Sequence, residues 1–192
     1  MLKADFVAAS GLPMAQADKW YEPVERAMME FAIVSPLRAA MFVATIGHET
    51  MGFTRLSEIW GPTDAQSRYD TRADLGNTRP DAIRIAALHG STPGSWWRGY
   101  GGIQITGYDN HKATGEALGY DLLNDPKQLT DPIKGMRSAG MWWKNNGCNE
   151  IADTGDFLRL SIRVNGKNRD GLPNGWADRQ RRYETAKAVL GK

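Results

Sequence analysis

The chain has few of the features that would at once define its class. Its 192 residues include a single cysteine, Cys148, so no disulfide can form within the chain and the fold must rest on packing. No stretch reaches the roughly 18 consecutive apolar residues of a membrane-spanning helix. The 24 basic and 22 acidic residues leave a formal net charge of +2, which is too small to indicate a nucleic-acid partner. The lone cysteine favours a reducing compartment.

The N-terminal segment does not predict a secretory signal. Its apolar run is brief and is interrupted by Asp5, whereas a signal peptide needs an unbroken apolar stretch of about 7–15 residues. We therefore expect a protein made in the cytoplasm. Any action outside that compartment would require another factor to release it.

Helical patterns dominate and predict a mainly α fold. Helices are expected over 14–32, where Pro23 would mark a kink or break, and from Ser35 and Pro36 to Gly52. A third is expected between Asp131 and Gly147, and two more over 153–166 and 176–192. Residues 61–102 are rich in glycine and predict a long irregular region with one short helix at 81–89. Loops of that length are often functional.

Two familiar motifs begin in this sequence and then fail. A zinc peptidase helix needs H-E-x-x-H, but the second histidine position after His48 and Glu49 is occupied by Gly52. A dinucleotide-binding loop needs G-x-G-x-x-G, but Gln104 stands where the third glycine belongs. No metal site and no cofactor are therefore expected.

A pair of carboxylates, Glu49 and Glu58, remains as a candidate for catalysis. Hydrolysis of a glycosidic bond with inversion needs one carboxylic acid to protonate the leaving oxygen and one carboxylate to activate water, roughly 6.5–9.5 Å apart. Nine residues of extended chain span about 30 Å, so the link must fold back, which Gly52 would allow. On spacing alone, two solvated surface glutamates are the better explanation of the pattern.

Four segments, taken together, resemble glycoside hydrolase family 19, and its phage endolysin branch in particular. They are PLRAAMFVATIGHET (36–50), RGYGGIQITGYDNH (98–111), RVNG (163–166) and ADRQRRYETAKAVL (177–190), in the family's order. The resemblance implies a lysozyme-like, two-lobed helical domain with a long irregular segment beside the active-site cleft. A single catalytic domain would span 1–192, with a small lobe within about 55–102.

The resemblance also implies roles for individual residues. Glu49 would be the general acid, Glu58 the general base, and the Thr106 hydroxyl would hold the attacking water. Arg179 and His48 would support the cleft, although an arginine in this basic helix is also consistent with a solvated face. The implied substrate-binding residues are Gln104, Asn110, Asn165 and Tyr100, and for the first two a loop-stabilising role is the alternative.

Two departures from the family pattern bear on substrate. Tyr100 replaces an arginine found in many relatives, and the short Glu49 to Glu58 link with one cysteine resembles the endolysins more than the plant chitinases. The expected protein is thus a monomeric endolysin that cleaves bacterial peptidoglycan. It would act from the host cytoplasm without inserting stably into the membrane, and a holin would give it access to the wall. A chitinase and a non-catalytic wall-binding module are the alternatives.

Overall fold

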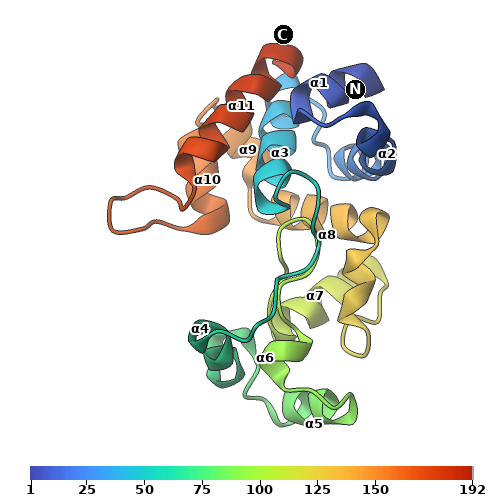
Figure 1. Ribbon diagram of the computed structural model, residues 1–192, viewed down its shortest axis with the longest axis vertical. Coiled ribbons are helices and arrows are strands. Elements are labelled where there is room, and N and C mark those ends of the chain that lie inside the picture. The colour runs from blue at the N-terminus through green and yellow to red at the C-terminus, as the bar shows by residue number, and fades with distance from the viewer. Residues whose placement is uncertain (192) are drawn as a thin grey trace. The chain divides into compact units, whose positions relative to one another are not determined.

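The computed structural model describes residues 1–191 and is mainly α, as predicted (Figure 1). Extended pairing in that range is limited to two isolated bridges, which join Ser57 to Tyr100 and Tyr100 to Ile105. None of the helices in the described chain is long and apolar enough to cross a membrane. The helices are α1 (Lys3–Ser10), α2 (Met14–Glu30), α3 (Pro36–Glu49), α4 (Asp64–Ser67), α5 (Pro80–Leu88), α6 (Pro93–Trp96), α7 (Tyr108–Leu118), α8 (Pro132–Asn145), α9 (Cys148–Asp153), α10 (Phe157–Asn165) and α11 (Trp176–Leu190), with 3-10 turns η1 (Arg68–Thr71), η2 (Ala73–Leu75) and η3 (Pro126–Thr130).

The chain divides into two compact units. Unit 1 combines Met1–Arg55 with the chain from Ala139 onward, and unit 2 is the continuous segment Leu56–Ser138. The second division falls inside α8, so that helix contributes to both units. Glu49 belongs to unit 1 and Glu58 to unit 2.

Helix α3 forms the core of unit 1. It packs against α1, α9 and α11, and every residue from Ala39 to Gly47 is buried. In the sequence, Leu37, Met41, Ala44 and His48 lie at helical spacing and form one apolar stripe, but in the structure the helix is covered on all sides over its central turns. A helix that is apolar all round is typical of the centre of a domain, so α3 is a rigid base for the residues at its end.

The helix ends expected from sequence are largely confirmed. The Ser35 hydroxyl accepts a hydrogen bond from the backbone N–H of Arg38 (3.3 Å), with Pro36 in the first turn of α3. Asp131 caps α8 in the same way through the N–H of Lys134 (3.0 Å). Pro23 lies inside α2 without breaking it.

Helix α3 ends at Glu49, and the reversal that follows uses more than Gly52. Met51, Gly52 and Phe53 all have positive φ, of 53°, 72° and 60°, which makes a left-handed turn. Non-glycine residues pay about 1–2 kcal/mol each for this conformation. Phe53 offsets that cost by burial, since its ring is 2% exposed and lies 5.6 Å from Phe6 and 5.8 Å from Trp20.

Unit 2 consists of short elements around a small core. Ala82, Ile85 and Ala86 of α5 pack with Trp97 and Tyr108, and the two aromatic rings meet edge to face at 5.0 Å. The short helix expected at 81–89 is present as α5. Helix α7 was not expected, because Gly115 and several polar residues give it a weak apolar period, and its burial comes from tertiary packing.

Candidate active site

Glu49 ends α3 beside a buried arginine. The guanidinium of Arg179 on α11 forms an ion pair with the Oε1 atom of Glu49 at 2.6 Å. Arg179 is 1% exposed, so the alternative of a solvated arginine is excluded, and the Glu49 side chain retains 16% exposure. The ion pair holds the Glu49 carboxylate against this buried cation.

A loop between α10 and α11 holds Arg179 in turn. The Nε of Arg179 donates to the carbonyl of Asn174 (2.9 Å), and the backbone N–H of Asn174 donates to Oδ1 of Asn165 (2.9 Å). Asn165 was predicted to bind substrate. In this structure its carbonyl oxygen supports the loop that positions Arg179, and thereby Glu49.

A second ion-pair group lies next to the first. Nδ1 of His48 is 2.7 Å from Oδ2 of Asp178, which also accepts from Nε of Arg182 (2.8 Å). Burial raises the pKa of Asp178, but the hydrogen bonds from Arg182 and His48 outweigh it, and the net pKa is lowered. Gly175, with φ of 71°, leaves room for the ring, because a Cβ there would lie 2.5 Å from His48 Cε1. Sequence reasoning missed Asp178.

Glu58 in unit 2 is surrounded by neutral donors. Its Oε1 accepts from Nε2 of Gln66 (2.9 Å) and has a long contact with the hydroxyl of Tyr69 (3.5 Å). Its Oε2 accepts from the backbone N–H of Gly99 (3.0 Å). Burial, followed by the negative charge of Glu58, raises the pKa of the Tyr69 phenol. Dipoles rather than a cation therefore orient this carboxylate.

Gln66 is the central member of this group, although its sequence context does not indicate a role at Glu58. Its side chain is 8% exposed, and its Nε2 donates to the carbonyl of Ile59 (2.7 Å) as well as to Glu58. Its Oε1 accepts from the N–H groups of Gly61 (3.3 Å) and Thr63 (2.9 Å). The one available signal was T-D-A-Q at 63–66, a capping box that predicts a local helix start rather than contact with a glutamate.

Three short extended segments place Glu58 and Thr106 on opposite sides of Tyr100. The N–H of Glu58 donates to the carbonyl of Gly99 (2.8 Å), and Tyr100 pairs on its other side with Ile105 through bonds of 3.0 and 2.8 Å. Two strand spacings, roughly 10 Å, therefore separate the backbones of Glu58 and Thr106. Thr106 donates its hydroxyl hydrogen to the Gln104 carbonyl (2.8 Å), and no hydrogen bond joins it to Glu58 in the described chain.

The two amides predicted to bind sugar are both engaged with backbone. Nε2 of Gln104 donates to the carbonyl of Gly101 (2.9 Å) and closes a turn in which Gln104 itself has φ of 52°. Nδ2 of Asn110 donates to the carbonyl of Thr106 (2.8 Å) at the start of α7. These are the loop-stabilising bonds that the sequence left as an alternative, and the carbonyl oxygens of both amides remain without a partner in residues 1–191.

Tyr100 was expected to contact substrate, and its side chain is buried in unit 2. Its ring is 1% exposed, lies edge to face with His111 at 6.0 Å, and forms the middle of the three extended segments. An aromatic ring must present a face to stack on a sugar, and this one is enclosed by its own unit. Trp97, another aromatic of the same region, is also fully buried.

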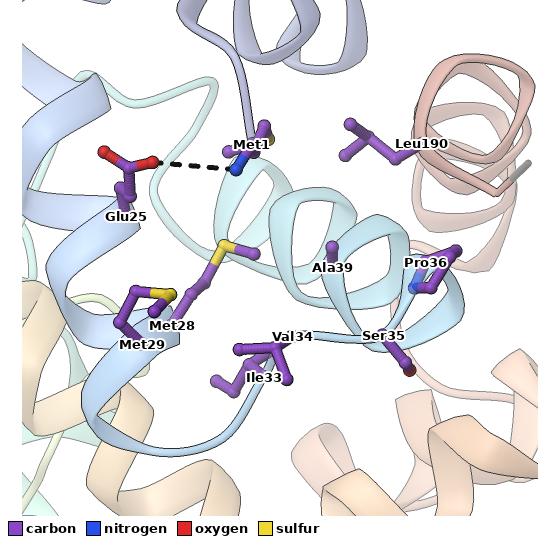
Figure 2. A pocket seen from close by; sticks show the side chains of 10 residues that line it. All are labelled: Met1, Glu25, Met28, Met29, Ile33, Val34, Ser35, Pro36, Ala39 and Leu190. Carbon is purple, nitrogen blue, oxygen red and sulfur yellow. Dashed lines mark ion pairs between the residues drawn. The ribbon is translucent and has the colours of Figure 1, made fainter.

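A pocket in unit 1 is unrelated to these side chains. It is lined by apolar residues that include Met28, Ile33 and Leu190, with the N-terminal ammonium 3.6 Å from Glu25 at one side (Figure 2). Pro36 and Ala39 place it at the first turn of α3, whereas Glu49 is the last residue of that helix. About 15–20 Å of helix separates the two ends.

Comparison with known proteins agrees with the helical fold. Residues 35–152 match the family model for glycoside hydrolase family 19, described as chitinase class I. A glycosyl hydrolase family 19 domain-containing protein of Haemophilus influenzae is 29% identical over 164 residues, which cover 76% of this chain and 79% of that protein. An endochitinase of Persea americana is 33% identical over 54% of this chain, which corresponds to 31% of its own length.

Solved structures give the same result for the fold. Chitinase C from Streptomyces griseus superposes with a TM-score of 0.72 at 22% identity, covering all of this chain and 76% of that one. A bacterial family 19 chitinase gives 0.70 at 23% identity, covering 99% of this chain and 94% of that one. The chain belongs to glycoside hydrolase family 19, because the family model matches more than half of it, and it is a glycoside hydrolase of the chitinase type.

Proposed function

We propose that this enzyme hydrolyses the glycan strands of bacterial peptidoglycan by inversion, with Glu49 as general acid and Glu58 as general base. One observation carries the assignment. Each glutamate is held by its own unit through specific donors, and each has an oxygen site left over for chemistry. Arg179 and Gln66, which contact the two carboxylates, are themselves buried, so each carboxylate is held in place before any substrate binds.

The proposed step assigns each oxygen. Arg179 holds Oε1 of Glu49, so Oε2 is the atom that would carry the proton to the glycosidic oxygen. A carboxylate has about four lone-pair sites, and the three contacts to Glu58 occupy two on Oε1 and one on Oε2. The remaining site on Oε2 would accept a proton from the attacking water. Thr106, whose hydroxyl oxygen is free to accept, would bind the far side of that water.

We propose peptidoglycan rather than chitin as the substrate for two reasons. The link between Glu49 and Glu58 is short and Cys148 is the single, buried cysteine, and both features resemble the endolysin branch. Chitin hydrolysis is the second candidate. It is favoured by the names of the related proteins from Persea americana and Streptomyces griseus.

Digestion of purified peptidoglycan and of chitin under matched conditions would separate the two. We expect mass spectrometry of the peptidoglycan products to show new reducing ends within the glycan, and NMR of the first product to show the inverted anomer. Release of soluble products from chitin alone would replace the proposal by the second candidate. A retained anomer would remove the inverting mechanism while leaving the substrate in place.

We further propose that the protein acts as a monomeric endolysin that reaches the wall only after a holin opens the membrane. Expression alone in a bacterium should leave it in the cytoplasmic fraction, with lysis following co-expression of a holin. Secretion without a holin, or turbidity loss in its absence, would contradict this route.

A further inference from the structure

Four basic side chains gather on α10 and on the loop that follows it in unit 1. They are Arg159, Arg163, Lys167 and Arg169, and together they are called the basic strip. The stretch 157–169 holds these four basic residues and no acidic one. It therefore carries a formal charge of +4 in a chain whose net formal charge is +2. None of the four has a role in the site described above.

The basic strip is exposed and forms no ion pair within residues 1–191. By contrast, Arg26 on α2 pairs with Glu22 at 2.7 Å. The two acids that flank the strip in the chain, Asp156 and Asp170, leave it unneutralised. Asp156 instead caps α10 by accepting from the backbone N–H of Arg159 (2.9 Å). The positive charge of the strip is thus available to an anionic partner.

Local structure keeps the members of the basic strip together. Arg159 and Arg163 are four residues apart on α10 and so lie on one face of the helix. The loop that carries the other two members extends away from α10 and α11 (Figure 1). Asn168 closes it, because its N–H donates to the carbonyl of Leu172 (2.8 Å) and its Oδ1 accepts from the N–H of Leu172 (3.1 Å). The loop is therefore ordered before any partner binds.

The basic strip adjoins the residues that hold Glu49. Lys167 follows Asn165 by two residues, at most about 7 Å of chain. Asn165 accepts a hydrogen bond from the N–H of Asn174 (2.9 Å). The carbonyl of Asn174 accepts from Arg179 (2.9 Å), which pairs with Glu49. A branched polymer with one bond at Glu49 would therefore have its branches near the strip.

The proposed substrate has the matching charge. A polymer of N-acetylglucosamine is neutral, whereas peptidoglycan bears peptide branches with free carboxylates. Guanidinium and ammonium groups bind carboxylates through charge-assisted hydrogen bonds. We propose that the basic strip binds the carboxylates of these peptide branches, so that the enzyme favours peptidoglycan over a neutral glycan. This inference rests on the proposed function.

The charge is tested on soluble peptidoglycan strands that keep their peptides and have been freed of phosphate polymers. Half of the material has its carboxylates converted to amides, which removes the charge and keeps the glycan. The wild-type chain should cleave the native strands with kcat/KM about fivefold or more above that for the amidated strands, mainly through KM, because several weak exposed contacts add up. A chain with Arg163→Gln, Lys167→Gln and Arg169→Gln should show a preference of about twofold or less.

A matched control removes three exposed cations of unit 1 outside the strip. The chain with Lys19→Gln, Lys144→Gln and Lys187→Gln should keep the wild-type preference. Both triple variants should melt within a few degrees of wild type, because neither loses an ion pair. An unchanged preference in the strip variant, or an equal loss in the control, would overturn the proposal. A strip dependence seen only before the phosphate polymers are removed would overturn it as well.

Binding separates this proposal from the proposed function. The full chain carrying Glu49→Gln is sedimented with native or amidated peptidoglycan, so that the polymer is not consumed. If the wild-type chain cleaves no peptidoglycan, but the Glu49→Gln chain binds the native form more tightly and loses this preference with the strip, the proposed function fails and the basic strip stands. If native and amidated strands are cleaved equally well, the proposed function stands and the basic strip fails.

Discussion

The two glutamates have the same chemistry and opposite surroundings. Glu49 in unit 1 faces a buried guanidinium, with the His48, Asp178 and Arg182 group beside it. Glu58 in unit 2 faces an amide, a phenol and a backbone N–H, all neutral. Unit 1 positions its carboxylate with formal charges from a long helix pair, whereas unit 2 does so with dipoles from short turns. The contrast predicts that the two units respond differently to substitution and to acid.

The largest expected effect is the loss of chemistry at either glutamate. Glu49→Gln and Glu58→Gln keep the side-chain shape but cannot transfer a proton, so each should lower glycan hydrolysis by at least about a hundredfold. Reducing-end assays on peptidoglycan would measure this. Glu184→Gln, an exposed glutamate on α11, is the matched control and should retain full activity. Activity near wild type in a folded Glu58→Gln would leave unit 2 without a catalytic carboxylate.

Removal of the arginine should damage unit 1 more than any neutral change damages unit 2. Arg179→Met leaves the Glu49 carboxylate without its cation, and we expect a loss of about 3 kcal/mol in the free energy of unfolding. That corresponds to a fall in Tm of roughly 6–12 °C. Arg181→Met on the same helix, with a side chain 71% exposed, should cost below about 0.5 kcal/mol. Equal Tm values for the two variants would show that the buried pair is not stabilising.

Acid should weaken unit 2 through a buried histidine. Burial lowers the pKa of His111 to about 4, against the hydrogen bond to the Gly107 carbonyl that raises it. Between about pH 6.5 and 4, His111 is therefore protonated in the unfolded chain and neutral in the folded chain. The free energy of unfolding should fall as the pH is lowered through this range, by about 3 kcal/mol at most. Urea unfolding at several pH values would measure the slope. His111→Gln should flatten it, and exposed His89→Gln should not.

Loss of the amide that orients Glu58 should have a smaller effect on stability than loss of Arg179. Gln66→Met removes neutral hydrogen bonds only, at about 1–2 kcal/mol, and should lower kcat about tenfold with little change in KM. Tyr69→Phe removes one long contact and should lower kcat about twofold. A Gln66 variant in which KM alone rises would assign this residue to substrate binding instead.

The smallest effect concerns Asp178. Its lowered pKa means that the stabilisation is present above the ordinary value of 3.8 and is lost as the pH falls below it. Asp178→Asn should therefore reduce stability by about 1 kcal/mol or less at pH 7 and by less at pH 3. Unfolding curves at those two pH values would test it. If Asp178→Asn lost more stability at pH 3 than at pH 7, the ionised Asp178 carboxylate would not be stabilising unit 1.

The amino-acid sequence determined the local structure and the identity of the chemical groups. Ser35 with Pro36, and Asp131 with Pro132, define the starts of α3 and α8 because a cap and a first-turn proline act on neighbouring backbone. The sequence presented Glu49 and Glu58 as a candidate pair, and the resemblance carried by the four segments assigned a role to each. The sequence did not reveal which residues contact each glutamate, because partners such as Arg179 and Gly99 are distant in the chain.

Only the tertiary structure decided how those groups are held. Arg179 reaches Glu49 across 130 residues because α11 packs on α3, and Gly99 reaches Glu58 across 41 because the segments on either side of Tyr100 pair. The same packing buries Tyr100, which the sequence presented as a sugar contact. A side chain's type sets what it can donate or accept, but its exposure and partners depend on contacts that the whole fold must form together.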